Sequence, residues 1–352
     1  MACLWGDRMG LLKRTAKQAC ALALVLLVLI APASALETDQ YYGWDRPLAD
    51  SGAGLNAKIN FELRAALAEV NAEDAGRGTE CREVIDVIKA RYTKFIFQKI
   101  ELWAARTAVL ERIPGTRQEE LDYRKNWIYR GIAWYDLGRL APPSPTLEVA
   151  GVRLGTDKLS HFFSEGHFYL DWYETARANG ASVAEAEELA VRRGVALEMT
   201  VLGGVISGVA SPGDLEANYQ GLLWFVKLCE GEQPDLVRTE AGWQLREPFD
   251  LRPYISPEWD ESYAPNVVTP GRWVRVKPAI VAHCAELDVP AVRARREAYA
   301  KRDTETFTEK VLAQMIQAGQ IDDPANYGIE RVCADSPLQH ANRAPAGAES
   351  SE

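Results

Sequence analysis

Most of the chain carries apolar residues at the spacing of an α-helix. Between residues 54 and 72, four apolar side chains recur at four-residue steps above a polar opposite side, which predicts an amphipathic helix. The same pattern predicts a long amphipathic helix over 80–113, ended by Pro114 and a glycine. A third helix is expected over 117–138.

The helical pattern stops at the prolines near residue 143, and alternation over 146–154 then predicts a short β-hairpin. Three further helices follow, of which the second continues to about residue 208 and the third to Cys229. Their expected starting residues are Thr156 as an N-cap, Ser182 with Glu185 as a capping box, and Ser211 with Pro212 at the first helical position.

After Cys229 the chain becomes rich in proline, tryptophan and tyrosine. Residues 272–277 (RWVRVK) alternate like an exposed strand, and residues 291–318 return to helix. The predicted fold is mainly α, with a helical bundle core, a short β-hairpin and a loop-rich, aromatic C-terminal region. The predicted regions are a helical one over 36–145, a three-helix polar core over 146–230, a loop-rich and helical one over 231–334, and a disordered tail over 335–352.

Residues 1–35 have the features of a signal peptide. Four basic residues precede the apolar run 19–35, which ends in Ala-Ser-Ala. We expect cleavage after Ala35 and a periplasmic or secreted mature chain. Without cleavage the run would serve as a membrane anchor, because it is nearly long enough to span a bilayer. No later run reaches the ~18 apolar residues of a membrane helix, so no transmembrane span is expected in the mature chain.

Charge and cysteines narrow the classes of function. The chain has 50 acidic residues against 40 Lys and Arg, a net charge of −10, which argues against nucleic acid and anionic membranes as partners. Four cysteines follow the predicted signal, and an even number in an exported chain favours two disulfides. Of three pairings, we favour Cys284 with Cys333 and Cys81 with Cys229. The absence of a CxxC pair argues against a zinc knuckle.

Ionisable residues crowd the start of the helix at residue 157, which otherwise carries mainly aromatic and aliphatic side chains. Asp157, Lys158, His161 and Glu165 all lie within its first turns. A turn of about 100° per residue places Asp157, His161 and Glu165 on one side. This side alone would suit contact with water, so the first helix by itself leaves the role of these residues open.

Three polar residues on the next two helices lie on apolar faces. Glu198 has valine or leucine at i−3, i+3 and i+4, and Asp214 and Asn218 share a face with apolar residues. A buried carboxylate without a partner is strongly destabilising or takes up a proton. We therefore expect Glu198, Asp214 and Asn218 to meet Lys158 and His161 across a three-helix core.

The ordered set DKLSHF, a helical glutamate and SPGDLEANYQG resembles the pattern of VanZ-like proteins and of small predicted periplasmic lipoproteins. The resemblance covers about residues 157–225, and the flanking regions have no counterpart. The helices of VanZ-like proteins are embedded in the membrane, whereas these are shorter and more polar. The resemblance implies a location in the cell envelope. The matching residues are Asp157, Lys158, His161, Phe162, Glu198, Asp214, Asn218 and Gly221.

One interpretation of these residues is a hydrolase that acts on an envelope glycan, lipid or peptide. Glu198 would be the general acid or base, His161 its proton partner and Lys158 an electrostatic stabiliser. A metal variant is conceivable, because Asp157, His161, Glu198 and Asp214 are suitable ligands for zinc or manganese. Lys158 beside a cation argues against it, so we expect no metal and no cofactor.

Two other interpretations remain. The polar residues would form a buried network that only pins the helices, or the aromatic stretch 253–266 would form a groove for a sugar or peptide. The alternative for that stretch is a loop packed against the helices by Tyr254 and Trp259. The chain has no GxSxG motif, phosphate-binding loop or dinucleotide fingerprint.

Overall fold

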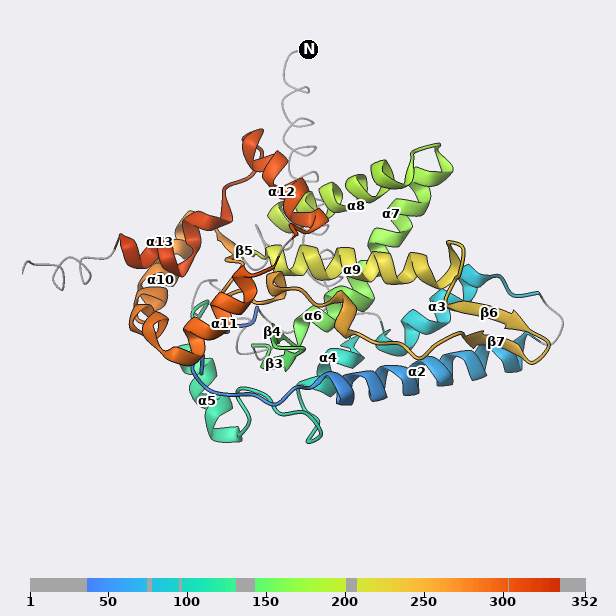
Figure 1. The fold of residues 1–352 in the computed structure, drawn as a ribbon, viewed down its shortest axis with the longest axis horizontal. Helices are drawn as coiled ribbons and strands as arrows, with labels where there is room; N and C mark the ends of the chain where they lie inside the picture. Colours follow the sequence, from blue (N-terminus) through green and yellow to red (C-terminus); the bar gives the residue numbers. More distant parts are fainter. Residues whose placement is uncertain are drawn as a thin grey trace, which may run out of the picture.

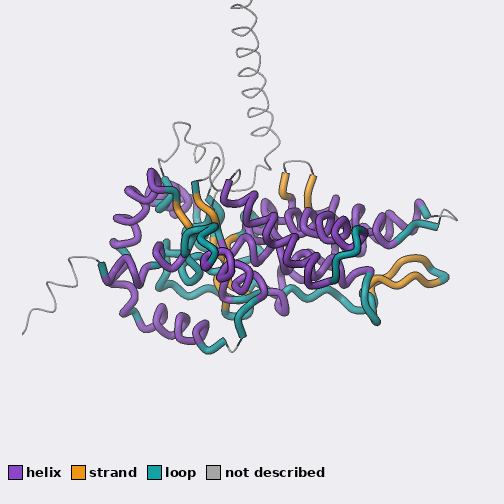
Figure 2. The backbone as a smooth tube through the Cα atoms, turned by 90° about the horizontal axis from the view of Figure 1, so that it is seen from above, coloured by secondary structure: helices purple, strands orange, loops and turns teal. Residues whose placement is uncertain are grey.

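The computed structural model describes residues 37–74, 78–94, 97–130, 143–200, 208–302 and 304–335. The fold is mainly α, as predicted, and α9 (Pro212–Cys229) runs through the middle of the molecule (Figure 1). Within the described ranges the strands form only short, two-stranded antiparallel pairs (Figure 2). The predicted signal peptide and all but the first residue of the predicted tail lie outside the described residues.

The N-terminal elements are α2 (Gly52–Glu73), α3 (Cys81–Tyr92), β1 (Thr93–Lys94), β2 (Phe97–Gln98), α4 (Lys99–Ala104) and α5 (Arg117–Asn126). The elements between them and α9 are β3 (Thr146–Val149), β4 (Val152–Gly155), α6 (Asp157–Ser160), the π-helical turn η2 (His161–Glu165), α7 (Gly166–Ala178), α8 (Val183–Leu197) and β5 (Val209–Ala210).

The C-terminal elements are β6 (Leu236–Thr239), β7 (Gly242–Leu245), η4 (Arg252–Tyr254), η5 (Pro257–Trp259), β8 (Val267–Val268), α10 (Pro270–Val281), η6 (Cys284–Asp288), α11 (Pro290–Ala300), α12 (Phe307–Gln317), η7 (Pro324–Tyr327) and α13 (Ile329–Ala334). Helices α10, α11 and α13 gather at one end of the molecule, and the β6–β7 hairpin lies at the other end beside α2 and α3 (Figure 1).

Several local predictions are confirmed. Strands β3 and β4 form the expected hairpin, with Thr146 opposite Gly155. Ser182 caps α8 in a capping box, and the Ser211 side chain accepts a hydrogen bond at the start of α9. Thr156 occupies the N-cap position of α6, but its side chain makes no capping hydrogen bond.

Other boundaries differ from the prediction. The helix expected over 80–113 is divided: α3 ends at Tyr92, where the β-branched Thr93 begins the short strand β1, and helix resumes only in α4. The helix expected over 117–138 ends at Asn126; its remainder falls partly on residues 131–142, outside the described ranges. The last part of the helix expected to reach 208 falls on 201–207, which is likewise outside them.

The strand expected over 272–277 is wrong, because these residues belong to α10. The buried residues of α10 are Arg272, Val276 and Ile280, which recur every fourth position and define a helical face. Pro270 occupies a first-turn position, where its missing N–H leaves no unmet hydrogen bond. The helix expected over 291–318 is divided into α11 and α12.

The helix that begins at Asp157 contains a π-helical turn. Helix α6, turn η2 and helix α7 follow one another directly, and η2 and α7 pack against α9. The two backbones approach closely where Gly166 faces Gly221. A Cβ atom at Gly166 would lie 2.8 Å from the Gly221 Cα, and one at Gly221 would overlap the backbone of Phe162. The absence of a side chain at Gly221 therefore allows α9 to pack closely against η2.

One large hydrophobic core joins distant parts of the chain, from Leu55 on α2 to Met315 on α12. At its centre Phe162 stacks on Trp224, with 5.6 Å between ring centroids. A smaller core lies under α10, α11 and α13 and includes Trp44 from the N-terminal segment. None of the helices in the described ranges combines the length and the apolar character that a membrane crossing needs.

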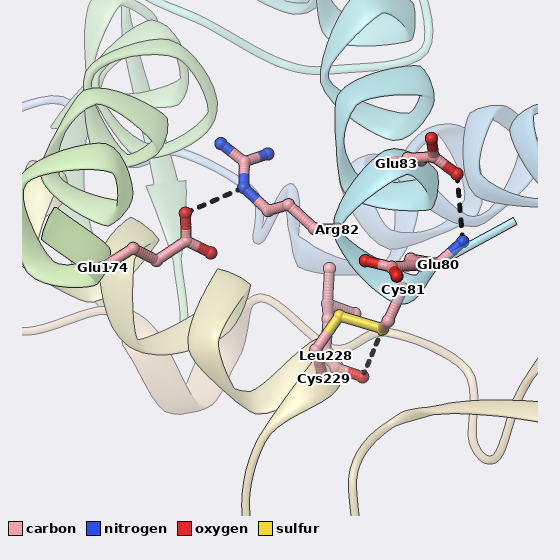
Figure 3. Close-up of a disulfide and its surroundings, with 7 residues drawn as sticks. All are labelled: Glu80, Cys81, Arg82, Glu83, Glu174, Leu228 and Cys229. Atoms are coloured by element: carbon pink, nitrogen blue, oxygen red, sulfur yellow. Dashed lines mark hydrogen bonds and ion pairs between the residues drawn. A yellow bond between two sulfur atoms is a disulfide. The ribbon is translucent and has the colours of Figure 1, made fainter. Parts of the chain in front are cut away.

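Both predicted disulfides are confirmed. Cys81 pairs with Cys229 and so ties the start of α3 to the end of α9 (Figure 3). Cys284 pairs with Cys333 and ties η6 to α13. Next to the first disulfide, Arg82 forms an ion pair of 3.0 Å with Glu174 on α7 (Figure 3). Helix α3 is therefore linked to α9 covalently as well as by packing.

Candidate functional site

Lys158 lies at the centre of a largely buried group of ionisable side chains. We call this group the polar cluster; its members are Glu37, Asp157, Lys158, His161, Glu165, Glu198, Asp214 and Glu261. The Lys158 side chain is fully buried. Its Nζ lies 2.8 Å from Asp157 Oδ2 and 2.6 Å from Asp214 Oδ1, and it donates a short hydrogen bond to Glu261 Oε1.

His161 is held by two residues of α9. Its Nε2 lies 3.2 Å from Asp214 Oδ2, and its Nδ1 lies 3.1 Å from Asn218 Oδ1. Both partners present acceptor oxygens, so the doubly protonated imidazolium satisfies both contacts. Burial lowers the pKa of His161, but the carboxylates of Asp214 and Glu165 outweigh burial and raise it to about 9. His161 is therefore a tethered cation at neutral pH, with 13% of its side chain exposed.

Glu198 is a buried carboxyl that favours its protonated form. It lies directly after the last residue of α8, with 4% of the residue exposed. Burial raises the pKa of Glu198 to about 8, with a further contribution from the Asp214 carboxylate, against the opposite effect of His161. The carboxylate oxygens of Glu37, Glu198 and Asp214 lie within 4.8 Å of one another. As predicted, Asp214 contacts both Lys158 and His161, and Asn218 contacts His161; Glu198 instead lies beside Asp214 and Glu37.

The carboxyls of the polar cluster outnumber its cations, since only Lys158 and His161 are basic. Burial raises the pKa of Glu165 and of Glu261, each to about 7, and that of Glu37 well above its ordinary value. The buried Oε2 atoms of Glu37 and Glu165 have no hydrogen-bond partner among the described residues, which also favours the neutral form.

Asp157 differs from the other carboxyls of the cluster. Burial acts to raise its pKa, but the adjacent Lys158 ammonium and His161 lower it below the ordinary value. The Thr38 hydroxyl also donates to Asp157 Oδ1 at 2.7 Å. The polar cluster therefore holds ionised and protonated carboxyls side by side.

Three members of the cluster were not among the predicted site residues: Glu165, noted only as an ionisable residue of the first helix, and Glu37 and Glu261. Glu261 comes from the loop after η5, and its Oε2 accepts a hydrogen bond of 2.8 Å from Asn266. Glu37 comes from the first described residues of the chain. Neither belongs to a helix, so no periodicity assigns a direction to its side chain. The neighbouring Trp259 is fully buried at 6.2 Å from the Phe162 ring, which agrees with a packed loop rather than with a binding groove.

Three overlapping sets of ligand atoms in the cluster have the spacing of a metal site. They are Asp157 with His161 and Asp214, Glu37 with Glu198 and Asp214, and Glu37 with Asp157 and Glu261. The Lys158 ammonium already contacts Asp157, Asp214 and Glu261. Because a divalent ion would have to share these carboxylates with the ammonium, we assign no metal to the cluster.

No family model, curated protein or solved structure matches this chain. The resemblance of residues 157–225 to the VanZ-like pattern therefore stays a prediction.

Proposed function

We propose that this chain is an exported cell-envelope protein whose polar cluster hydrolyses an envelope component by general acid–base catalysis. One observation carries the proposal: neighbouring carboxyls of the cluster have pKa values moved in opposite directions. Burial and Asp214 raise the pKa of Glu198 to about 8, whereas Lys158 lowers that of Asp157. Such separated pKa values within one site are typical of acid–base catalysts.

Each residue has a proposed role that follows from its contacts. Glu198, protonated at neutral pH, donates a proton to the leaving group and as a carboxylate then accepts one from water. His161, a partly exposed cation, stabilises negative charge that develops on the substrate. Asp214 and Asn218 orient the imidazole ring. Lys158 is fully buried and acts as a positioning residue for the carboxylates.

The proposed substrate is an envelope glycan, lipid or peptide. The two disulfides fit an oxidising compartment, and the predicted signal peptide and the resemblance to envelope proteins agree with it. The net charge of −10 makes nucleic acid an unsuitable partner.

The test is turnover by the variant Glu198→Gln. Purified protein is incubated with peptidoglycan, phospholipid vesicles or an unstructured peptide, and products are detected by mass spectrometry. Glutamine has the shape and the neutral charge of protonated Glu198, so we expect turnover to be lost and the unfolding midpoint at pH 6 to be unchanged. Glu188→Gln, on α8 and in a partly exposed ion pair with Arg192, is the matched control and should keep its activity.

The pH profile of turnover gives a second readout. Because the acid form of Glu198 is required, activity should fall as the pH rises through about 8. Full turnover by Glu198→Gln on a substrate that the wild type cleaves would contradict the assigned role.

The burial of the cluster favours a second candidate, a non-catalytic structural or binding protein. Lys158 and its carboxylate partners are at most 4% exposed, and together they join α6, α9 and the loop after η5. For this candidate, none of the three substrate classes is cleaved, and the network contributes only to stability.

A further inference from the structure

A cavity of about 300 Å³ lies between α2, α3 and α4 and shares no residue with the polar cluster. Its lining includes Lys58, Glu62, Arg91, Lys99 and Trp103. We infer that this cavity, the anion pocket, binds a small phosphate-bearing molecule. The inference does not depend on the proposed hydrolytic function.

The charge of the lining is the first argument. Three cationic side chains and one carboxylate line the anion pocket, although the chain as a whole has a net charge of −10. Lys58 on α2, Arg91 on α3 and Lys99 on α4 bring three positive groups to one cavity. A tetrahedral anion with several oxygens suits such an arrangement better than a single planar carboxylate does.

The second argument is that the cations keep hydrogen-bonding capacity. Lys99 Nζ donates a hydrogen bond of 2.7 Å to the Ala90 carbonyl oxygen and has no carboxylate partner among the described residues. Arg91 pairs with Glu69 through Nη2, while its buried Nε has no partner within the same ranges. A buried donor without an acceptor is unfavourable, so a ligand oxygen that reaches it is stabilised.

The third argument is that the pocket is built before a ligand arrives. The Lys58 ammonium lies 5.7 Å from the ring centroid of Trp103 and 5.5 Å from that of Phe61, and it pairs with Glu62 at 2.6 Å. The pocket also has an apolar wall, which is formed by Ile100 and by rings such as Trp103. The volume lies at the lower end for small-molecule sites, which favours a ligand such as a short phosphomonoester.

The experiment is a calorimetric titration of the full chain with inorganic phosphate and with glycerol 3-phosphate at low salt. Lys99→Gln removes one exposed cation whose only described partner is a backbone carbonyl, so the fold should be unaffected. Loss of one charge-assisted contact should weaken binding by about tenfold. Lys125→Gln removes an exposed lysine of α5 outside the pocket and is the matched control, with an expected change below about twofold.

Sedimentation with vesicles of phosphatidylcholine alone or mixed with phosphatidylglycerol distinguishes the two sources of phosphate. Binding of the soluble phosphates assigns the pocket to a free ligand. Binding only to the mixed vesicles, weakened by Lys99→Gln and not by Lys125→Gln, assigns it to a lipid headgroup. Absence of binding in every arm, or equal weakening by both variants, would overturn the inference.

Discussion

Replacement of Lys158 by methionine tests the electrostatics of the polar cluster most directly. At 2.8 Å from Asp157 and 2.6 Å from Asp214, an effective dielectric constant of about 20 gives an attraction of ~6 kcal/mol for each contact. Glu261 adds a third contact. The cost of dehydrating the ions offsets most of this attraction, and breaking a buried ion pair typically destabilises a protein by ~3–5 kcal/mol. We expect a loss in this range for Lys158→Met at pH 8.

The loss should depend on pH. Without the ammonium, the three carboxylates repel one another, so the pKa values of Asp157 and Glu261 in the folded variant rise above those in the unfolded chain. Folded carboxyls then hold protons that the unfolded chain has released, and the stability of the variant falls as the pH rises. The difference between the wild type and Lys158→Met should therefore be smaller at pH 5 than at pH 8.

Urea unfolding followed by tryptophan fluorescence measures this difference, since the chain contains 10 tryptophans. The matched control is Lys125→Met on exposed α5, which should change the free energy of unfolding by at most ~0.5 kcal/mol. A loss for Lys158→Met below ~1 kcal/mol at pH 8 would refute the reasoning. The same conclusion would follow from a loss that is equal at both pH values.

Three other predictions concern the contributions of pH, close helix packing and a disulfide to stability. The pKa of Glu198 is raised to about 8, so the stability of the fold should decrease as the pH rises from 4.5, the ordinary pKa of glutamate, to about 8. The pKa of His161 is raised to about 9, so its contribution to stability is complete below pH 6.5 and is lost as the pH rises through 9. Thermal melts should therefore show a lower midpoint at pH 9 than at pH 5; equal midpoints would count against these shifts. Gly221→Ala forces α9 and η2 apart and should lower the free energy of unfolding in urea by ~1–3 kcal/mol. An unchanged free energy of unfolding would indicate that the two backbones lie farther apart. Replacing Cys81 and Cys229 by serine opens a link between residues 148 positions apart and should cost up to ~5 kcal/mol in the same assay; a chain that melts alike with and without reductant would argue against the pairing.

The meeting of helices at the polar cluster was predictable because helical periodicity assigns each residue to a face. Glu198 lies on an apolar face and therefore required a buried partner. Asp214 and Asn218 likewise lie on the apolar face of the third helix. Lys158 and His161 were the nearest residues able to serve as partners, and the contacts of Asp214 with both are observed.

Two residues of the site that were not predicted, Glu261 and Glu37, come from segments without a regular hydrophobic period. Glu261 lies in a loop and Glu37 precedes the first helix, so their directions depend on tertiary packing. A short window also misled the prediction for 272–277, because six residues fit a period of two as well as a helical period. Pro270 two positions earlier and the apolar Ile280 would have favoured the helix.

The residues just after the predicted cleavage site take part in the polar cluster, so the position of cleavage changes the cluster. Glu37 is the second residue after Ala35, and its neighbours Thr38 and Gln40 donate or accept hydrogen bonds at Asp157 and Glu261. A chain cut after Ala35 carries a new α-ammonium group one residue from Glu37. A cut five residues later removes that carboxyl and both hydrogen-bonding neighbours. The choice of the first residue in any recombinant version therefore sets the composition of the cluster itself.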